Sequence, residues 1–376
     1  MTSVRQRLSE NLFNIRGWRT NRKIIVIESD DWGSIRMPSK EVYEDCLEHG
    51  YRLDNTVFSR YDSLASEEDL TLLFELLLSF KDWKSNHPVV TANCLMANPD
   101  FERIQNSNFE KYYYELVTDT FNKYPKHKNC FNLWQQGEKL NIFKPQSHGR
   151  EHLNVSRFMN ELRAGDPDSH FAFRHQMPNI LKKSSESIVN SSIIALEHYD
   201  AADKSDKELI VKDGLLLFRK LFGYSSESFI ASNYVWHKDL ETVLKAEKVL
   251  FIQGSKKQYI PKGKYRGFTY KFHFLGEMNS MKQIYLIRNV LFEPALNMTH
   301  DHISSSLRQI ETAFAWHKPA IISMHRVNFI GFINEKIRDR TLKLLQQLLR
   351  VILRRWPDVE FLSTAELGNL ILEEQS

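Results

Sequence analysis

Ile24-Ile25-Val26-Ile27 is a short apolar run, and the acidic pair Asp30-Asp31 follows it almost at once. A continuous apolar run of this length predicts a strand buried on both faces, as in the parallel sheets of α/β proteins. In such folds the chemistry lies beyond the C-terminal ends of the strands. The run therefore predicts an α/β fold and indicates where its functional side chains lie.

Eight apolar runs of this kind occur along the chain, at residues 23–29, 88–93, 142–147, 228–232, 249–253, 284–288, 320–324 and 359–363. Amphipathic helical patterns separate them, including one that begins at Ser66 and others over about 303–314 and 334–356. Alternating strands and helices are typical of βα units. Because there are seven or eight such units, we expect a barrel.

Residues 153–225 fit this alternation poorly, because the segment is polar and has helix-like patches. We expect it to be a mostly helical insertion over the active-site face, where barrels of this kind diversify. The whole chain, residues 1–376, is predicted to form a single catalytic barrel domain that carries this insertion.

The composition excludes several classes of protein. The chain of 376 residues carries 51 basic and 47 acidic residues, a balance that gives no strong electrostatic case for nucleic-acid binding. Its three cysteines are widely spaced and suggest neither a disulfide framework nor a zinc ribbon. No export signal and no membrane-spanning run is visible, so we expect a cytoplasmic protein without a membrane span.

Histidines follow two of the predicted strands. His148 and His152 come after the run at 142–147, and His325 comes after the run at 320–324. Histidines four apart would share one face of a helical turn. Taken alone, the aspartate pair could cap a helix and the histidine pair could lie on the surface. Their joint occurrence at strand ends predicts a metal site of one aspartate and two histidines, with the second aspartate free to act as a base.

In this order, the motifs resemble those of the polysaccharide deacetylases, the NodB-homology group of carbohydrate esterases. The resemblance covers the chain from residue 24 to about residue 326. It implies a distorted (β/α) barrel that holds one divalent metal ion, usually zinc. It also implies that Asp30 is the general base, that Asp31, His148 and His152 are the metal ligands, and that His325 is the general acid. The implied activity is removal of acetyl groups from an amino sugar or acetylated glycan.

Several residues depart from the family pattern. Trp32 stands between the aspartates and Gly33, and Gly149 replaces the Ser or Thr that usually follows the first histidine. The arginine of the third motif, which steadies the base, has no match in the segment 222–234. Glu277 and Glu293 are the two candidates for the acidic partner of His325.

Trp32, Asn93 and Asn233 are the predicted substrate contacts, since each follows or ends a predicted strand, although such residues can equally cap helices. Two other functions stay open at this point. A metal-containing barrel could bind carbohydrate without catalysis, as the missing arginine favours. A glycoside hydrolase on a related barrel could use Asp30 or Asp31 as its nucleophile.

Overall fold

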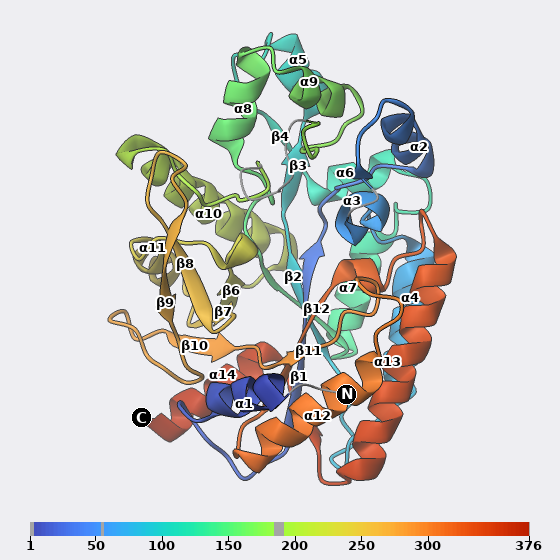
Figure 1. The fold of residues 1–376 in the computed structure, drawn as a ribbon, viewed down its shortest axis with the longest axis vertical. Coiled ribbons are helices and arrows are strands. Elements are labelled where there is room, and N and C mark those ends of the chain that lie inside the picture. The colour runs from blue at the N-terminus through green and yellow to red at the C-terminus, as the bar shows by residue number, and fades with distance from the viewer. Residues whose placement is uncertain (1–3, 54–55, 184–191, 376) are drawn as a thin grey trace.

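The computed structural model describes residues 4–53, 56–183 and 192–375, and Figure 1 shows the resulting ribbon. Its main sheet is parallel throughout, in the order β10-β7-β6-β5-β2-β1-β12-β11. The strands in this order are β1 (Ile24–Trp32), β2 (Val90–Cys94), β5 (Phe143–Ser147), β6 (Ser228–Ile230), β7 (Phe251–Gly254), β10 (Ile284–Ile287), β11 (Val290–Leu291) and β12 (Ala320–His325), and a ninth strand pairs with β1 outside this order.

The two edges of this sheet are parts of one interrupted strand. Only Arg288 and Asn289 separate β10 from β11 in the chain. The Arg288 amide donates to the carbonyl of Gly254 in β7, and the Asn289 amide donates to the carbonyl of Ile321 in β12. The backbone therefore changes partner between two consecutive residues, and this change closes the sheet. With β10 and β11 counted as one strand, the predicted α/β barrel of seven or eight strands is confirmed.

The barrel is distorted at two places. Strands β5 and β6 share a single register pair, Ser147 and Phe229. The short strand β13 (Glu360–Phe361) pairs only with the start of β1. Outside the barrel, β3 (Ala97–Pro99) pairs with β4 (Tyr114–Leu116), and β8 (Lys257–Pro261) pairs with β9 (Phe268–Phe272), both antiparallel.

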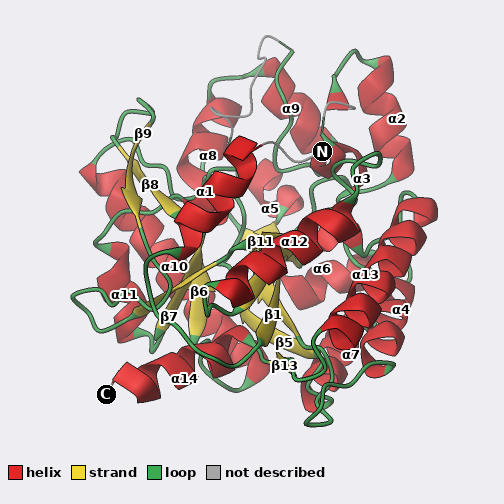
Figure 2. Cartoon of the chain, turned by 60° about the horizontal axis from the view of Figure 1, so that its bottom comes forward, coloured by secondary structure: helices red, strands yellow, loops and turns green. Residues whose placement is uncertain are grey.

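Helices surround the barrel, as Figure 2 shows. They are α1 (Val4–Asn14), α2 (Lys40–Glu48), α3 (Val57–Tyr61), α4 (Glu67–Leu78), α5 (Phe101–Asn106), α6 (Val117–Lys123), α7 (Cys130–Lys139), α8 (Val155–Arg163), α9 (Pro167–Arg174), α10 (Ala201–Phe222), α11 (Leu240–Ala246), α12 (His302–Ala315), α13 (Glu335–Arg355) and α14 (Thr364–Gln375), with the 3-10 turns η3 (Ser232–Tyr234) and η4 (Arg326–Asn328).

The helix expected at Ser66 begins there because of a capping box. The Ser66 hydroxyl accepts from the Asp69 amide, and the Asp69 carboxylate accepts from the Ser66 amide. Its buried stripe of Leu70, Leu73 and Leu77 then packs into the main apolar core around β1 and β2.

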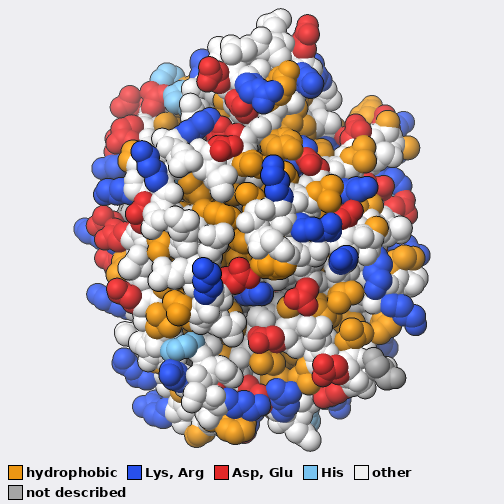
Figure 3. Space-filling view, turned by 180° about the vertical axis from the view of Figure 1, so that it is seen from behind, with side chains coloured by type: hydrophobic (Ala, Val, Ile, Leu, Met, Phe, Trp, Pro, Cys, Tyr) orange, Lys and Arg blue, Asp and Glu red, His pale blue; other side chains and the backbone are white. Residues whose placement is uncertain are grey.

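The segment between β5 and β6 contains α8, α9 and α10, so the prediction of a mostly helical insertion is confirmed for the residues described there. Helices α8 and α9 lie at the end of the molecule toward which β1 and β2 point (Figure 1). Across the described residues, no helix combines the length and apolar character that a membrane span requires. Figure 3 shows basic and acidic side chains interspersed over one face, as expected from their near balance in the sequence.

Candidate active site

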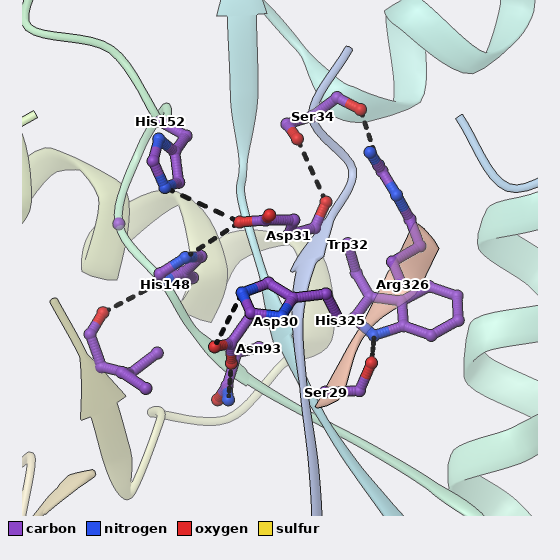
Figure 4. A network of polar contacts seen from close by, with 12 residues as sticks. Ser29, Asp30, Asp31, Trp32, Ser34, Asn93, His148, His152, His325 and Arg326 are labelled. Carbon is purple, nitrogen blue, oxygen red and sulfur yellow. Dashed lines mark hydrogen bonds and ion pairs between the residues drawn. The ribbon is translucent and has the colours of Figure 1, made fainter. Parts of the chain in front are cut away.

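The acidic pair lies among the last residues of β1, inside the strand rather than beyond it. The pairing of β1 with β2 shifts register between Ser29 and Trp32, which marks a bulge. Within the bulge Asp31 adopts a φ of 73°, in the left-handed region that L residues seldom occupy. The irregular backbone brings both carboxylates to the C-terminal mouth of the barrel, where they face different partners (Figure 4).

Asp31, His148 and His152 converge as predicted. The Oδ1 atom of Asp31 lies 3.3 Å from Nε2 of His148 and 3.7 Å from Nε2 of His152. One ligand atom from each residue lies within 4.8 Å of the others, a spacing at which a single ion can bridge them. Figure 4 shows both imidazoles pointing at the Asp31 carboxylate.

The prediction that the two histidines share one face of a helical turn is wrong. Residues 148–154 form an irregular loop after β5. Gly149 has a φ of 108°, which a side chain would disfavour, and this turn of the backbone brings the two rings to 5.4 Å. The spacing of four residues therefore marked the correct pair for the wrong geometric reason.

The protonation states of these side chains suit a divalent metal. The Nδ1 proton of His148 is donated to the Ile230 carbonyl at 2.9 Å, which leaves the Nε2 lone pair facing Asp31. Burial and the charge of Arg36 lower the pKa of His152 to about 3, so its imidazole is neutral. Burial opposes ionisation of Asp31, but the charge of Arg36, the largest favourable contribution, helps to lower its pKa well below the usual range.

The donor set is therefore one carboxylate and two imidazoles, which fits a catalytic metal with three protein ligands and an open position. A second contact orients the Asp31 carboxylate, because its Oδ2 accepts a hydrogen bond from Nη2 of Arg36 at 2.8 Å. His152 departs from the usual arrangement: its Nδ1 is buried and finds no hydrogen-bond partner among the described residues.

Asp30 is held by an arginine that the sequence motif did not reveal. Arg288 donates from Nη1 to Oδ2 and from Nη2 to Oδ1 of Asp30, both at 2.6 Å, and from Nε to Glu28 at 2.5 Å. Burial alone would raise the pKa of Asp30, but the charge and hydrogen bonds of Arg288 hold it at about 2. The arginine partner of Asp30 was expected in the segment 222–234. It is instead Arg288, at the point where the barrel closes.

His325 lies beside Asp30 on the neighbouring strand, since the two are register partners in β12 and β1. Its Nε2 is 3.9 Å from Oδ2 of Asp30, and its Nδ1 is 2.5 Å from Oε1 of Glu293. Burial disfavours the imidazolium, but Glu293 outweighs burial and raises the pKa of His325 to about 9. Of the two candidate partners, Glu293 is the one in contact, whereas Glu277 pairs with His273.

The predicted substrate contacts fare unevenly. Trp32 is only 1% exposed, donates to the Ser29 hydroxyl, and packs its ring edge-on against Phe143, so it is a core residue. Asn93 is fully buried, and its amide donates to Asp30 and Gln253, so the expectation of substrate contact is replaced by a role in positioning Asp30. Asn233 is exposed in η3, with a φ of 55°.

No protein-family model and no curated protein matches this chain. Solved structures that resemble it include 4-alpha-glucanotransferase from Thermococcus litoralis (10% identity, 94% of this chain and 40% of that chain, TM-score 0.44). They also include a protein named "putative glycoside hydrolase/deacetylase" from Parabacteroides distasonis (9% identity, 95% and 72%, TM-score 0.49) and Puue allantoinase (9% identity, 94% and 91%, TM-score 0.45). The likeness is too low to identify a reaction or a substrate, and this chain spans well under half of the glucanotransferase.

Proposed function

We propose that this protein is a metal-dependent hydrolase that removes acetyl groups from an amino sugar or acetylated glycan. One observation carries the proposal: two proton-transfer groups, Asp30 and His325, flank the mouth of the barrel where Asp31, His148 and His152 converge. Each of the two has its own charged partner, Arg288 for Asp30 and Glu293 for His325.

The opposite pKa shifts divide the roles between them. Asp30 is ionised at neutral pH and accepts the proton of the attacking water. His325 is protonated and donates to the leaving nitrogen or oxygen, and its side chain is 27% exposed, so a substrate can reach it. Pairs of titratable groups whose surroundings separate their pKa values are typical of acid–base sites.

A carboxylate with so low a pKa is a weak base and needs a water whose own pKa is lowered, which a divalent metal bound by Asp31, His148 and His152 would supply while polarising the acyl carbonyl. Zinc is the metal proposed, because nitrogen and oxygen donors with one open position are typical of its catalytic sites. The hydrogen bonds from Arg288 to Asp30 remove the main reason for preferring a binding protein without catalysis.

Metal content and acetate release test the proposal together. The purified protein is expected to hold one metal per chain by mass spectrometry and to release acetate from N-acetylated chitooligosaccharides or O-acetylated xylan. His148→Ala should lose metal and activity, whereas His49→Ala, at an exposed histidine on the surface, should lose neither.

Asp30→Asn should retain the metal yet release no acetate. Full activity of this variant would contradict the assignment of Asp30 as base. Release of reducing sugar without acetate would favour the glycoside hydrolase, and a metal-loaded protein that binds these glycans without cleaving them would favour a binding barrel.

A further inference from the structure

A pocket with mostly apolar walls lies beside the candidate metal site. His152 and Arg36 form part of its wall, Ile35 and Pro99 add apolar surface, and two further segments of chain supply other apolar side chains. Leu53 and Phe58 approach from the α3 side, and Met177, Ile180 and Leu181 approach from the predicted insertion. The sequence motifs did not predict this pocket. It has no role in the proton transfers described above.

The pocket is continuous with the catalytic groups through direct contacts. Arg36, which donates to Asp31, lies with its guanidinium 5.1 Å from the ring centroid of Phe58. The same Phe58 ring meets the His325 ring edge-on at 5.0 Å. Because His152 is both a candidate metal ligand and part of the pocket wall, a group attached to a carbonyl held at His152 would lie next to the pocket.

Apart from Nδ1 of His152, which has no partner in the described part of the chain, polar groups of the wall such as Asn98 and Glu151 already have hydrogen-bond partners. The Asn98 side chain accepts from the Ile35 amide and donates to the Gly33 carbonyl, and Glu151 pairs with Arg150. A sugar hydroxyl buried here would lose its hydrogen bonds to water and gain few in return, which is costly. A hydrocarbon chain carries no such cost and is favoured by removal of apolar surface from water.

The size of the pocket limits the length of the hydrocarbon chain that it can hold. It offers about 70 Å³ of space to a water-sized sphere. One water needs roughly 10–15 Å³ on this scale, so the space holds about five or six atoms of that size. This matches the tail of a short acyl group better than a lipid or a sugar ring.

We propose that this pocket binds the hydrocarbon tail of a short acyl group, so that the site accepts acyl groups longer than acetyl, such as butanoyl and hexanoyl. The inference rests on the proposed function, because it requires hydrolysis at Asp31, His148 and His152. In the reaction, water adds its oxygen to the acyl carbon, the bond from that carbon to nitrogen or oxygen breaks, and the proton goes to the leaving group. The products are the short carboxylic acid and the free amine or alcohol.

Alkyl hydroxamates test the pocket by binding, because their head group chelates metal and their tail occupies the acyl position. Calorimetry on the zinc-loaded protein would compare acetohydroxamate, butanohydroxamate and hexanohydroxamate. We expect affinity to rise by about fourfold for each buried methylene. Equal affinity across the series would overturn the inference while leaving the proposed deacetylase intact. Binding of none of them would contradict the proposed function and the inference with it.

Variants that fill the pocket give an independent readout. Leu181→Trp, from the insertion side, and Ser59→Trp, from the α3 side, should reduce hexanohydroxamate affinity to that of acetohydroxamate while leaving acetohydroxamate binding unchanged. Leu209→Trp, at an exposed position of α10, is the matched control and should change neither. Loss of affinity for all three ligands alike would overturn the placement of the tail. If affinity rose with tail length only for alkyl glycosides, the pocket would bind the leaving group instead of the acyl tail. That result would also overturn the inference.

Discussion

Arg288 binds Asp30 through both terminal guanidinium nitrogens, each 2.6 Å from a different carboxylate oxygen, at the residue where the barrel closes. The same side chain also reaches Glu28, so two buried carboxylates share one arginine. A bidentate pair of this kind fixes the carboxylate in direction as well as in charge. Closure of the barrel and positioning of the candidate base are therefore carried out by the same residue.

Replacing this arginine should be costly. Arg288→Met removes the cation that two buried carboxylates share, and we expect the free energy of unfolding to fall by about 3–5 kcal/mol. Arg355→Met is the matched control, because it breaks an exposed pair with Glu311 and should cost less than about 1 kcal/mol. Urea unfolding of both variants measures the difference. Equal costs would mean that Arg288 is not needed to balance the buried charge.

The pairing of His325 with Glu293 predicts a dependence of stability on pH in the metal-free protein. The pKa of His325 is raised from 6.5 to about 9, so the folded protein keeps a proton that the unfolded chain releases. The stabilisation is complete below pH 6.5 and is lost as the pH rises through about 9. Glu293→Gln should remove this loss, as measured by urea unfolding at pH 6, 7.5 and 9.5.

The same variant has a kinetic consequence. Since Glu293 keeps His325 protonated, Glu293→Gln should move the alkaline limb of the rate profile to lower pH, while His325→Ala should reduce the rate roughly 10²–10⁴-fold with metal retained. Glu311→Gln, at an exposed carboxylate, is the control for loss of a negative charge. An unshifted alkaline limb in Glu293→Gln would contradict the assignment of His325 as the acid.

The loop at Gly149 should control metal affinity. Gly149→Ala places a side chain at a φ of 108° with nothing within 4 Å to clash, so its effect comes from the backbone alone. We expect the loop to relax, to separate His148 from His152, and to weaken zinc binding by at least tenfold. Gly165→Ala is matched, with a φ of 69° and open space around it, and should leave zinc affinity unchanged. Competition with a chromogenic chelator measures both, and equal zinc affinities would disprove the role of Gly149.

Trp32 should behave as a core residue. Trp32→Phe removes the hydrogen bond to Ser29 and part of a buried ring, and we expect it to lower the free energy of unfolding by about 1–3 kcal/mol without changing KM. Asn233→Ala, at an exposed position with a φ of 55°, should cost about 1 kcal/mol because alanine tolerates this conformation less well than asparagine, and it raises KM if Asn233 contacts substrate. A raised KM with full stability in Trp32→Phe would return Trp32 to the substrate site.

The apolar runs, the capping box at Ser66 and the acidic pair at the end of β1 were predictable from the sequence, because burial and helix capping leave local patterns in the chain. The convergence of Asp31, His148 and His152 was predictable for a similar reason: parallel strands present their C-terminal ends at one mouth. These signals determined the barrel and named its candidate metal ligands.

Only the tertiary structure decided which side chains meet. Arg288 reaches Asp30 because the backbone changes partner strand at that residue, Glu293 rather than Glu277 reaches His325 because β11 lies beside β12, and Trp32 turns into the core because β1 bulges. Such contacts depend on strand stagger and on barrel closure, which are set by packing across the whole molecule. These contacts cannot be predicted from a local stretch of sequence, because residues distant in the chain determine them jointly.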